Sequence, residues 1–263
     1  MTRIAEKFKV LKAGNEKALV PFFCAGDPDL ITTHDLVLAL EQAGADIIEL
    51  GIPYTDPLAD GPVIQAAAAR ALKNDITIVD ILDLVKRLRE TTQIPIVFLL
   101  YFNCILQYGT ERFLKECAAS GVDGLVIPDL PYEEKLQYNA LFFEYDIDII
   151  PLVTPVSKAR MQKIVKDSTG FIYCVTSTGT TGIRDRFSTD LKRFLDEVKQ
   201  YSDTPRLLGF GISSPEQVKA LKNYGEGVIV GSAVVKKMDT DAPKTKMIRT
   251  VADFISELKQ ALR

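Results

Sequence analysis

Short apolar runs alternate with longer stretches of helical periodicity from residue 18 to the end of the chain. The apolar runs are nearly continuous rather than alternating, which is typical of parallel strands buried on both faces. Eight runs predict strands: Ala18–Ala25, Asp46–Gly51, Pro95–Phe102, Gly124–Pro128, Ile147–Val153, Phe171–Thr176, Arg206–Gly211 and Gly227–Val230. Amphipathic helical patterns separate them, among them Leu30–Ala43, Val79–Arg89, Glu133–Phe143 and Ile248–Leu262. Eight strand–helix units favour an α/β fold, with the sheet closed into a (β/α)8 TIM barrel.

The residues before the first strand predict an extra N-terminal helix. Ile4, Phe8 and Leu11 recur at helical spacing, so we expect a short amphipathic helix that closes one end of the barrel. This stretch is charged throughout and lacks the apolar segment of a signal peptide, which predicts a cytoplasmic protein. No linker or low-complexity stretch interrupts the pattern, so residues 1–263 are expected to form a single domain.

Composition narrows the classes of function. The 263 residues match the ~250 of a typical barrel. The net charge is −3 without a long Lys/Arg block, so a nucleic-acid partner is not expected. The longest apolar runs are far shorter than the ~20 residues of a membrane helix, so no membrane partner is expected. The four cysteines form no CxxC pair, which argues against a disulfide framework or a zinc site, and we expect neither metal nor cofactor.

Acidic residues gather after the second strand. Glu49 stands at its carboxyl end, and Asp60 follows in the next loop, where barrels place catalytic groups. A buried glutamate can donate a proton near neutral pH while a more hydrated aspartate stays ionised, so the two could form an acid/base pair. Alternatively, Glu49 caps or salt-bridges a neighbouring loop. Asp56, between Thr55 and Pro57, is more typical of a turn or a surface contact.

Glycines mark the ends of the seventh and eighth predicted strands. Gly209 and Gly211 are followed by Ser213 and Ser214, either of which can cap the next helix, and Gly231-Ser232 begins a short helical segment. Barrels bind phosphate in these two loops through backbone N–H groups, so little Lys or Arg is needed, and little is found in these stretches. The alternative is that the glycines only permit tight turns.

The remaining chemistry is limited by what is absent. The single histidine, His34, is expected on a solvated helix, and no predicted strand ends in a lysine that could form a Schiff base. What remains is proton transfer by carboxylates on a phosphorylated substrate. The polar stretch TSTGTTGIRDR (176–186) has the composition of a loop that closes over a barrel site, or of a disordered connection.

Six stretches closely resemble the α subunit family of tryptophan synthase, along nearly the whole chain. They are PFFCAGDP (21–28), GADIIELGIPYTDPLADGPVIQ (44–65), GVDGLVIPDLP (121–131), STGTTG (177–182), LLGFGIS (207–213) and VGSAVV (230–235). The resemblance implies a carbon–carbon lyase of tryptophan biosynthesis that cleaves indole-3-glycerol phosphate to indole and glyceraldehyde 3-phosphate by a retro-aldol reaction. It also implies a β subunit that receives the indole, in an α2β2 tetramer.

The same resemblance implies a role for individual residues. Glu49 is implied as the acid/base at indole C3 and at the side-chain hydroxyl, and Asp60 as the carboxylate at the indole N–H. The implied indole pocket consists of Phe22, Leu99, Tyr101 and Tyr173. The implied phosphate site consists of Gly182, Phe210, Gly211, Gly231 and Ser232. Thr181 is implied as a lid threonine that organises the two acids, and Asp56 as part of a loop facing the β subunit.

Two departures from the family pattern are small. Cys24 replaces a common threonine, and Thr180 stands where the lid usually has valine. Two other readings remain open. One is another phosphate-binding barrel, such as indole-glycerol-phosphate synthase or a ribose-phosphate isomerase. The former would have catalytic lysines at strand ends, which are not found in this sequence. The other is a chain that mainly binds and regulates a second subunit, against which the intact pair of acids argues.

Overall fold

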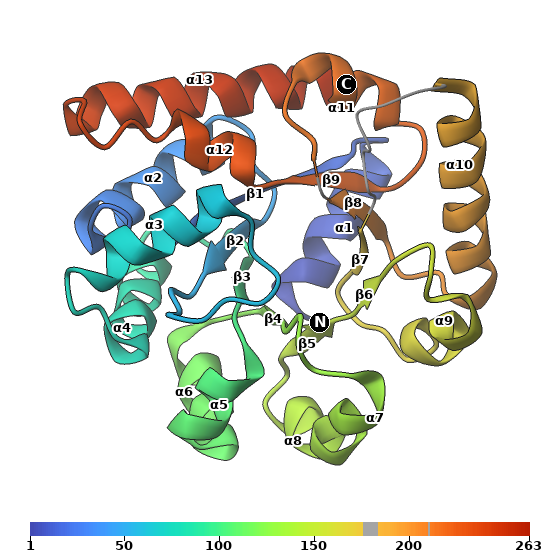
Figure 1. Ribbon diagram of the computed structural model, residues 1–263, viewed down its shortest axis with the longest axis horizontal. Helices are drawn as coiled ribbons and strands as arrows, with labels where there is room; N and C mark the ends of the chain where they lie inside the picture. Colours follow the sequence, from blue (N-terminus) through green and yellow to red (C-terminus); the bar gives the residue numbers. More distant parts are fainter. Residues whose placement is uncertain (176–183, 210) are drawn as a thin grey trace.

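The computed structural model describes residues 1–175, 184–209 and 211–263, and it folds as the predicted barrel with helices around a parallel sheet (Figure 1). The strands are β1 (Ala18–Cys24), β2 (Ile48–Gly51), β3 (Ile96–Leu99), β4 (Gly124–Val126), β5 (Asp148–Ile150), β6 (Leu152–Val153), β7 (Ile172–Val175), β8 (Arg206–Gly209) and β9 (Gly227–Val230). Their order in the sheet is β5-β4-β3-β2-β1-β9-β8-β7-β6, and every pairing is parallel.

The fifth predicted strand, Ile147–Val153, appears as the two pieces β5 and β6. Pro151 separates them and cannot donate a backbone hydrogen bond, which interrupts the ladder. β5 pairs with β4 and β6 pairs with β7, so this one stretch of chain joins the two edges of the sheet. The Pro151 carbonyl still accepts a bond of 2.9 Å from the Tyr173 N–H. If β5 and β6 are counted as one interrupted strand, the barrel has the eight strands that the sequence predicts.

The helices differ from prediction mainly around the middle of the chain. They are α1 (Arg3–Ala13), α2 (Leu30–Gln42), α3 (Pro62–Leu72), α4 (Ile78–Arg89), α5 (Phe102–Tyr108), α6 (Thr110–Ser120), α7 (Tyr132–Lys135), the 3-10 helix η1 (Leu136–Tyr138), α8 (Asn139–Glu144), α9 (Lys158–Val165), α10 (Arg184–Tyr201), α11 (Pro215–Leu221), α12 (Ser232–Lys237) and α13 (Lys244–Leu262). The predicted helix Glu133–Phe143 is broken into α7, η1 and α8, and α5 was not predicted.

Capping explains where the regular helices begin. The Thr77 hydroxyl accepts the Asp80 N–H, and the Asp80 carboxylate accepts the Thr77 N–H, so α4 starts with a complete capping box. Its last turn carries Lys86, Arg87 and Arg89, which complement the helix dipole. Of the two candidate caps of α11, it is Ser214 whose hydroxyl accepts the Gln217 N–H.

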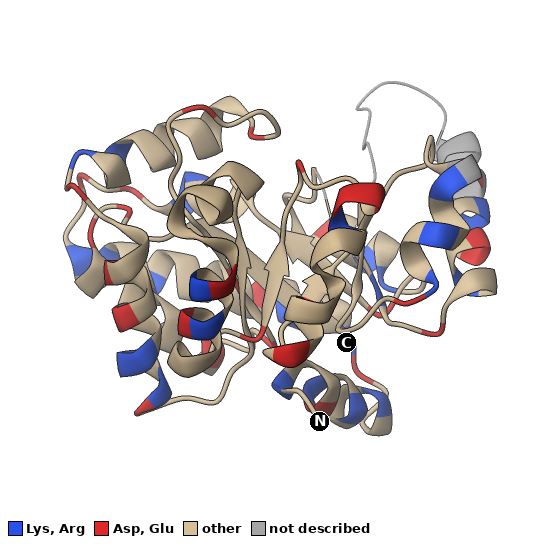
Figure 2. Ribbon diagram, turned by 90° about the horizontal axis from the view of Figure 1, so that it is seen from below, with Lys and Arg blue, Asp and Glu red and all other residues tan. Residues whose placement is uncertain are grey.

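The N-terminal helix α1 closes the amino-terminal end of the barrel (Figure 2). Ile4, Phe8 and Leu11 are buried, as predicted, against the side chains that fill the barrel interior. The Thr2 hydroxyl also donates to Asp148, at the start of β5, at 3.0 Å. α1 therefore covers the end of the barrel opposite the predicted site.

Three acids before strands hold the same end together. Each accepts the backbone N–H at or near the start of the preceding strand, and each pairs with a buried or half-buried cation. The pairs with N–H groups are Asp46 with Leu19 at 2.9 Å, Asp123 with Ile96 at 2.7 Å and Glu226 with Arg206 at 2.8 Å. Asp46 pairs with Lys259 at 2.7 Å, Asp123 with Arg89 at 2.8 Å and Glu226 with Arg206 at 2.8 Å. Asp46 and Asp123 thus share a structural role as well as a sequence pattern, since each is preceded two residues earlier by a glycine, Gly44 or Gly121.

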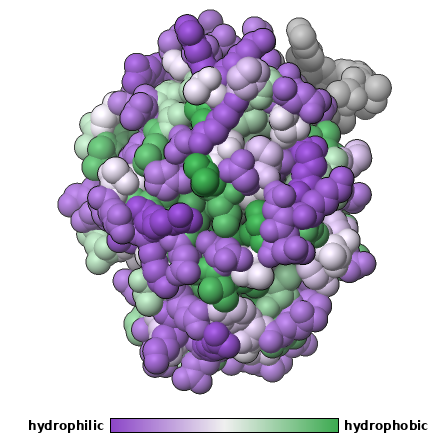
Figure 3. All heavy atoms as spheres, turned by 90° about the vertical axis from the view of Figure 1, so that its left-hand side faces the viewer, coloured by the Kyte–Doolittle hydropathy of each residue, from purple (hydrophilic) through white to green (hydrophobic). Residues whose placement is uncertain are grey.

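Lys, Arg, Asp and Glu residues lie mostly in the helices and loops around the sheet (Figure 2). The face on the left of Figure 1 is largely polar, with apolar atoms visible between the polar side chains near its centre (Figure 3). None of the described helices is long and apolar enough to cross a membrane.

Candidate active site

A cavity of about 470 Å³ opens among the carboxyl ends of the strands and the loops that follow them. Both predicted acids, Glu49 and Asp60, line it. So do apolar residues from β1, β3 and β7, and the glycines and serines that follow β8 and β9. The cavity therefore has an acidic, partly aromatic region and a region built of small residues.

Glu49 is placed in the barrel interior by strand register. Side chains alternate along a strand, and Ile47, two residues earlier, belongs to the buried interior cluster. Glu49 pairs with Phe22 on β1 and with Val97 on β3, so an acid lies where a barrel interior is usually apolar. Its side chain is buried, and within the described part of the chain neither carboxyl oxygen has a hydrogen-bond partner.

This setting makes Glu49 a weak acid. Removal from water disfavours the charged form, and the nearby charge of Asp60 adds to the effect, so the pKa of Glu49 rises to about 8. An unpaired, buried carboxylate would be costly, whereas a protonated carboxyl group is tolerated. Glu49 is therefore mainly protonated at neutral pH, which is the form that donates a proton.

Folding stability should report this protonation. The unfolded chain loses the Glu49 proton near its ordinary pKa of 4.5, whereas the folded chain keeps it up to about pH 8. The folded form binds more protons in this interval, so the native chain loses stability as the pH rises through it. Glu49→Gln lacks this dependence. We expect the thermal midpoint of Glu49→Gln minus that of the native chain to increase between pH 5 and pH 9. An exposed control, Glu257→Gln, should show no such trend. A difference independent of pH would contradict the prediction.

Asp60 lies in the loop between β2 and α3 and is held by Tyr101. The Tyr101 hydroxyl donates to the Asp60 carboxylate at 3.0 Å and accepts the Ala59 N–H at 2.9 Å. Burial raises the pKa of Asp60, and the hydrogen bond from Tyr101 opposes that rise because it favours the ionised form. Burial raises the pKa of Tyr101 to about 12, so its hydroxyl keeps its proton to donate. Asp60 thus has a hydrogen-bond donor, whereas Glu49 has none among the described residues.

Glycines make room for the aromatic walls of the cavity. A methyl group on Gly51 would come within 2.6 Å of the Phe22 ring, and one on Gly209 within 2.3 Å of the Tyr173 ring. Both contacts are closer than atoms can approach, so a larger residue would displace the ring. Burial raises the pKa of Tyr173, and the charges of Glu49 and Asp60 add to this effect, which indicates that its hydroxyl lies near both acids.

Small residues from two loops form the other region. Gly211 has φ +78°, a left-handed conformation that glycine adopts without strain. Gly231 precedes α12, and Ser232 is the first residue of that helix and is exposed to the cavity side. The Ser213 N–H and hydroxyl both donate to Gln217, at 2.7 and 3.0 Å. Ser213 is therefore engaged by α11, while Ser232 is accessible.

Comparison with known proteins identifies the family. The family model described as "Tryptophan synthase alpha chain" matches residues 8–263. The chain belongs to the tryptophan synthase alpha chain family. It is 50% identical over 262 residues to the tryptophan synthase alpha chain of Caldanaerobacter subterraneus subsp. tengcongensis, covering 100% of both chains. It is 51% identical over 258 residues to that of Alkaliphilus metalliredigens, covering 98% of this chain and 97% of the other.

A solved structure agrees. The tryptophan synthase subunit alpha of Legionella pneumophila superposes with a TM-score of 0.90 at 33% identity, covering 100% of this chain and 98% of that one. The family and the barrel expected from the sequence are thus confirmed. As a tryptophan synthase alpha chain, the protein is a lyase of tryptophan biosynthesis that cleaves indole-3-glycerol phosphate.

The structure gathers most of the residues that the family resemblance singles out. Those that line the cavity are Phe22, Glu49, Asp60, Leu99, Tyr173, Gly211, Gly231 and Ser232. Tyr101 lies beside Asp60 rather than in the cavity wall. Asp56 is exposed, next to the exposed Leu58, and does not line the cavity. Thr181, Gly182 and Phe210 lie outside the described residues, as does most of the predicted lid at 176–186.

Two basic residues just outside the glycine-containing stretches also line the cavity. Lys236 and Lys237, at the end of α12, line the cavity together with Gly231 and Ser232. They follow Gly231 by five and six residues and lie in a helix, so sequence reasoning that considered only the loops missed them. Helical periodicity was the signal that could have found Lys236, since residues four apart share a helix face.

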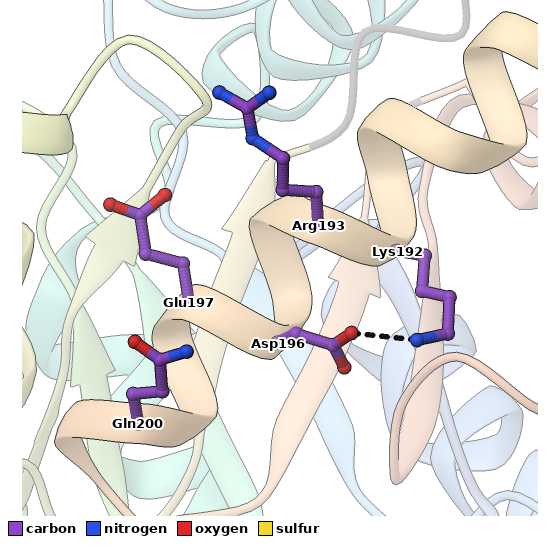
Figure 4. A pocket seen from close by; sticks show the side chains of 5 residues that line it. All are labelled: Lys192, Arg193, Asp196, Glu197 and Gln200. Carbon is purple, nitrogen blue, oxygen red and sulfur yellow. Dashed lines mark hydrogen bonds and ion pairs between the residues drawn. The ribbon is translucent and has the colours of Figure 1, made fainter.

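A second hollow, on the outer face of α10, is not lined by residues from several strands and loops as the cavity is (Figure 4). Its five lining residues all come from that one helix, and Lys192 pairs with Asp196 across it at 2.8 Å. Both side chains of this pair are more than half exposed. An exposed i,i+4 ion pair of this kind is ordinary helix-surface chemistry.

Proposed function

We propose that Glu49 and Asp60 carry out the family's reaction in this cavity, with Glu49 as the proton donor and acceptor. The observation that supports this most is the buried Glu49 carboxyl group, whose two oxygens have no partner in the described part of the chain. An unpaired acid at this depth costs folding stability, and strongly perturbed acids of this kind cluster at functional sites. Asp60, held by the Tyr101 hydroxyl, lines the same cavity, and in this proposal it acts on a second position of the substrate.

The two regions of the cavity suit the two ends of indole-3-glycerol phosphate. The indole ring would lie against Phe22, Leu99 and Tyr173, within reach of the acids. The phosphate would bind at Gly211, Gly231 and Ser232, where backbone N–H groups and a hydroxyl can donate to it. This orientation places the bond to be cleaved between the aromatic wall and the small residues.

Glu49 can serve both proton transfers of the cleavage. Its carboxyl group donates a proton to indole C3, and the ring electrons that form the new C–H bond leave an electron-poor indolenine. The bond from C3 to the glycerol side chain then breaks, and its electron pair restores the aromatic ring. The side-chain hydroxyl becomes an aldehyde and gives its proton to the Glu49 carboxylate. Glu49 ends in the protonated form in which it began, which is the form that its pKa favours.

Asp60 favours the intermediate electrostatically. Protonation at C3 places positive charge on the ring, mainly at its N–H group. A carboxylate hydrogen-bonded to that N–H stabilises the charge as it develops, and it does so in a site partly removed from water. The Tyr101 hydroxyl fixes the orientation of Asp60 before the substrate arrives, so little reorganisation is needed.

An assay of indole formation from indole-3-glycerol phosphate, with and without a β subunit, tests the proposal. We expect indole in both cases, with more when the β subunit is present. A chain that only binds and regulates its partner would release no indole by itself or in the complex, and that result would contradict the proposed function.

Placing a negative charge in the small-residue region should weaken phosphate binding. We expect Gly211→Asp and Ser232→Asp to raise the dissociation constant of glycerol 3-phosphate at least about tenfold, because each carboxylate would face the phosphate dianion. The measurement is calorimetric titration with this ligand. Because Gly211 has a positive φ, its variant can also strain the loop, whereas Ser232→Asp begins a helix with a favoured acidic residue.

Ser214→Asp is the matched control for these variants. It adds the same charge in the loop after β8, at the capping position of α11, where aspartate caps as well as serine. We expect it to bind glycerol 3-phosphate nearly as the native chain does. If Ser232→Asp binds as tightly as this control, the phosphate lies elsewhere.

The wider organisation follows from family membership and sequence. We propose that the chain binds a β subunit as an α2β2 tetramer and passes indole to it, because relatives are the alpha chains of a two-component synthase. The exposed Asp56 and Leu58 are placed in a loop beside the cavity mouth, where a partner could contact both the loop and the site. One domain over residues 1–263 and a cytoplasmic location are the other proposals that the sequence supports.

A further inference from the structure

We propose that Lys236 determines specificity for a phosphorylated substrate, because its ammonium group attracts and pairs with the phosphate dianion. The inference rests on the proposed phosphate position and adds a charged residue to a site otherwise made of backbone and hydroxyl donors. Lys236 is a binding residue in this account and takes no part in the proton transfers.

Helix geometry places Lys236 beside the proposed phosphate site. α12 runs from Ser232 to Lys237, so Lys236 lies four residues after Ser232 on the same helix face. Both side chains line the cavity together with Gly211 and Gly231. About 6 Å separates the two positions along the helix axis, and a lysine side chain is long enough to span that distance.

The cavity wall carries charges of both signs. The two acids, Glu49 and Asp60, line it, and so do two basic residues among those described, Lys236 and Lys237. A phosphate dianion is attracted by a free ammonium group and repelled by a carboxylate, so a lysine without a partner in this wall favours binding of the phosphate on its own side.

The two lysines differ in what they contact. The Lys237 ammonium lies 5.3 Å from the centre of the Phe254 ring of α13, a cation–π distance. Lys236 is exposed and, among the described residues, has neither a hydrogen bond nor an ion pair. Its ammonium group is therefore available to a ligand, whereas that of Lys237 already has a partner.

A free ammonium group adds a full positive charge to the phosphate site, which backbone N–H groups cannot supply. Backbone N–H groups bind phosphate at short range and in fixed geometry, while a full positive charge also acts over several ångströms and depends on ionic strength. Removing it should weaken binding of phosphorylated ligands without affecting the chemical step. An exposed ion pair of this kind corresponds to a change of up to about fivefold in binding.

Kinetics of Lys236→Gln in the presence of the β subunit test the inference. We expect the KM for indole-3-glycerol phosphate and the inhibition constant of glycerol 3-phosphate to rise about twofold to fivefold, with kcat nearly native. Inhibition by indole-3-propanol, which lacks the phosphate, should not change. The fall of kcat/KM with added salt should be shallower than in the native chain. Lys236→Arg, which keeps the charge, should restore most of the KM.

Lys237→Gln is the matched control, because it removes the same charge from the next residue while its ammonium contacts Phe254. We expect its KM to stay near native. The inference is overturned if Lys236→Gln leaves both the KM and the glycerol 3-phosphate inhibition constant unchanged, or if the two lysine variants behave alike. In that case the proposed phosphate position still stands if Ser232→Asp weakens phosphate binding, and it fails with the inference if Ser232→Asp has no effect. The proposed roles of Glu49 and Asp60 are tested separately, by indole formation.

Discussion

Glu49→Gln is expected to reduce indole formation from indole-3-glycerol phosphate by at least ~10²–10⁴-fold while the chain stays folded. The amide is nearly the same size as the protonated carboxyl group that occupies this buried position, so packing against Phe22 on β1 is retained. It can neither donate a proton to C3 nor accept one from the hydroxyl. Because one group serves both transfers, no other residue takes over half of the task.

The measurement is kcat for indole release by the purified variant with the β subunit, beside its affinity for glycerol 3-phosphate. We expect near-native affinity, which shows that the cavity is intact. Glu257→Gln on the exposed face of α13 serves as a control and should keep native kcat. If Glu49→Gln keeps more than about a tenth of native kcat, Glu49 is not the acid/base of the reaction.

Asp60→Asn should lower kcat by ~10²–10³-fold with a smaller change in KM. The asparagine can still accept the hydrogen bond from Tyr101, but it no longer carries the charge that stabilises the protonated ring. The loss therefore falls on the transition state more than on substrate binding. Removal of the Asp60 charge should also lower the pKa of Glu49, while burial, the larger cause, keeps it above its ordinary value.

Asp56→Asn is the matched control, since Asp56 is an exposed acid in the same loop that does not line the cavity. Measured on the isolated chain, where no partner contact is at stake, it should keep native kcat. Full activity of Asp60→Asn in the same assay would remove Asp60 from the mechanism.

The barrel was predictable because its strands are buried on both faces. β9 was predicted residue for residue, and β1 ended one residue earlier than predicted. The errors came from local backbone chemistry rather than from hydrophobicity. Pro151 broke one strand into two pieces, and α5, at Phe102–Tyr108, continued an apolar run that periodicity alone could not distinguish from the end of β3.

The site was predictable only as far as strand ends and loops reveal it. Glu49 and Asp60 stood out by position, and register then brought Glu49 beside Phe22. The hydrogen bond between Tyr101 and Asp60 joins residues 41 apart, so no local pattern indicated it. The closeness of Gly209 to the Tyr173 ring likewise depends on two neighbouring strands, whereas the sequence suggested a phosphate-binding loop or a tight turn.

Titration of the Glu49 carboxyl group tests the central claim most directly. Carbon-13 NMR of the chain labelled at glutamate side-chain carboxyls, with Glu49→Gln to assign the signal, reports its protonation at each pH. The account predicts a midpoint near pH 8, as expected for a buried acid that holds its proton until the substrate takes it. A midpoint near 4.5, the ordinary value for glutamate, would mean that Glu49 is ionised at rest and would contradict its role as the proton donor.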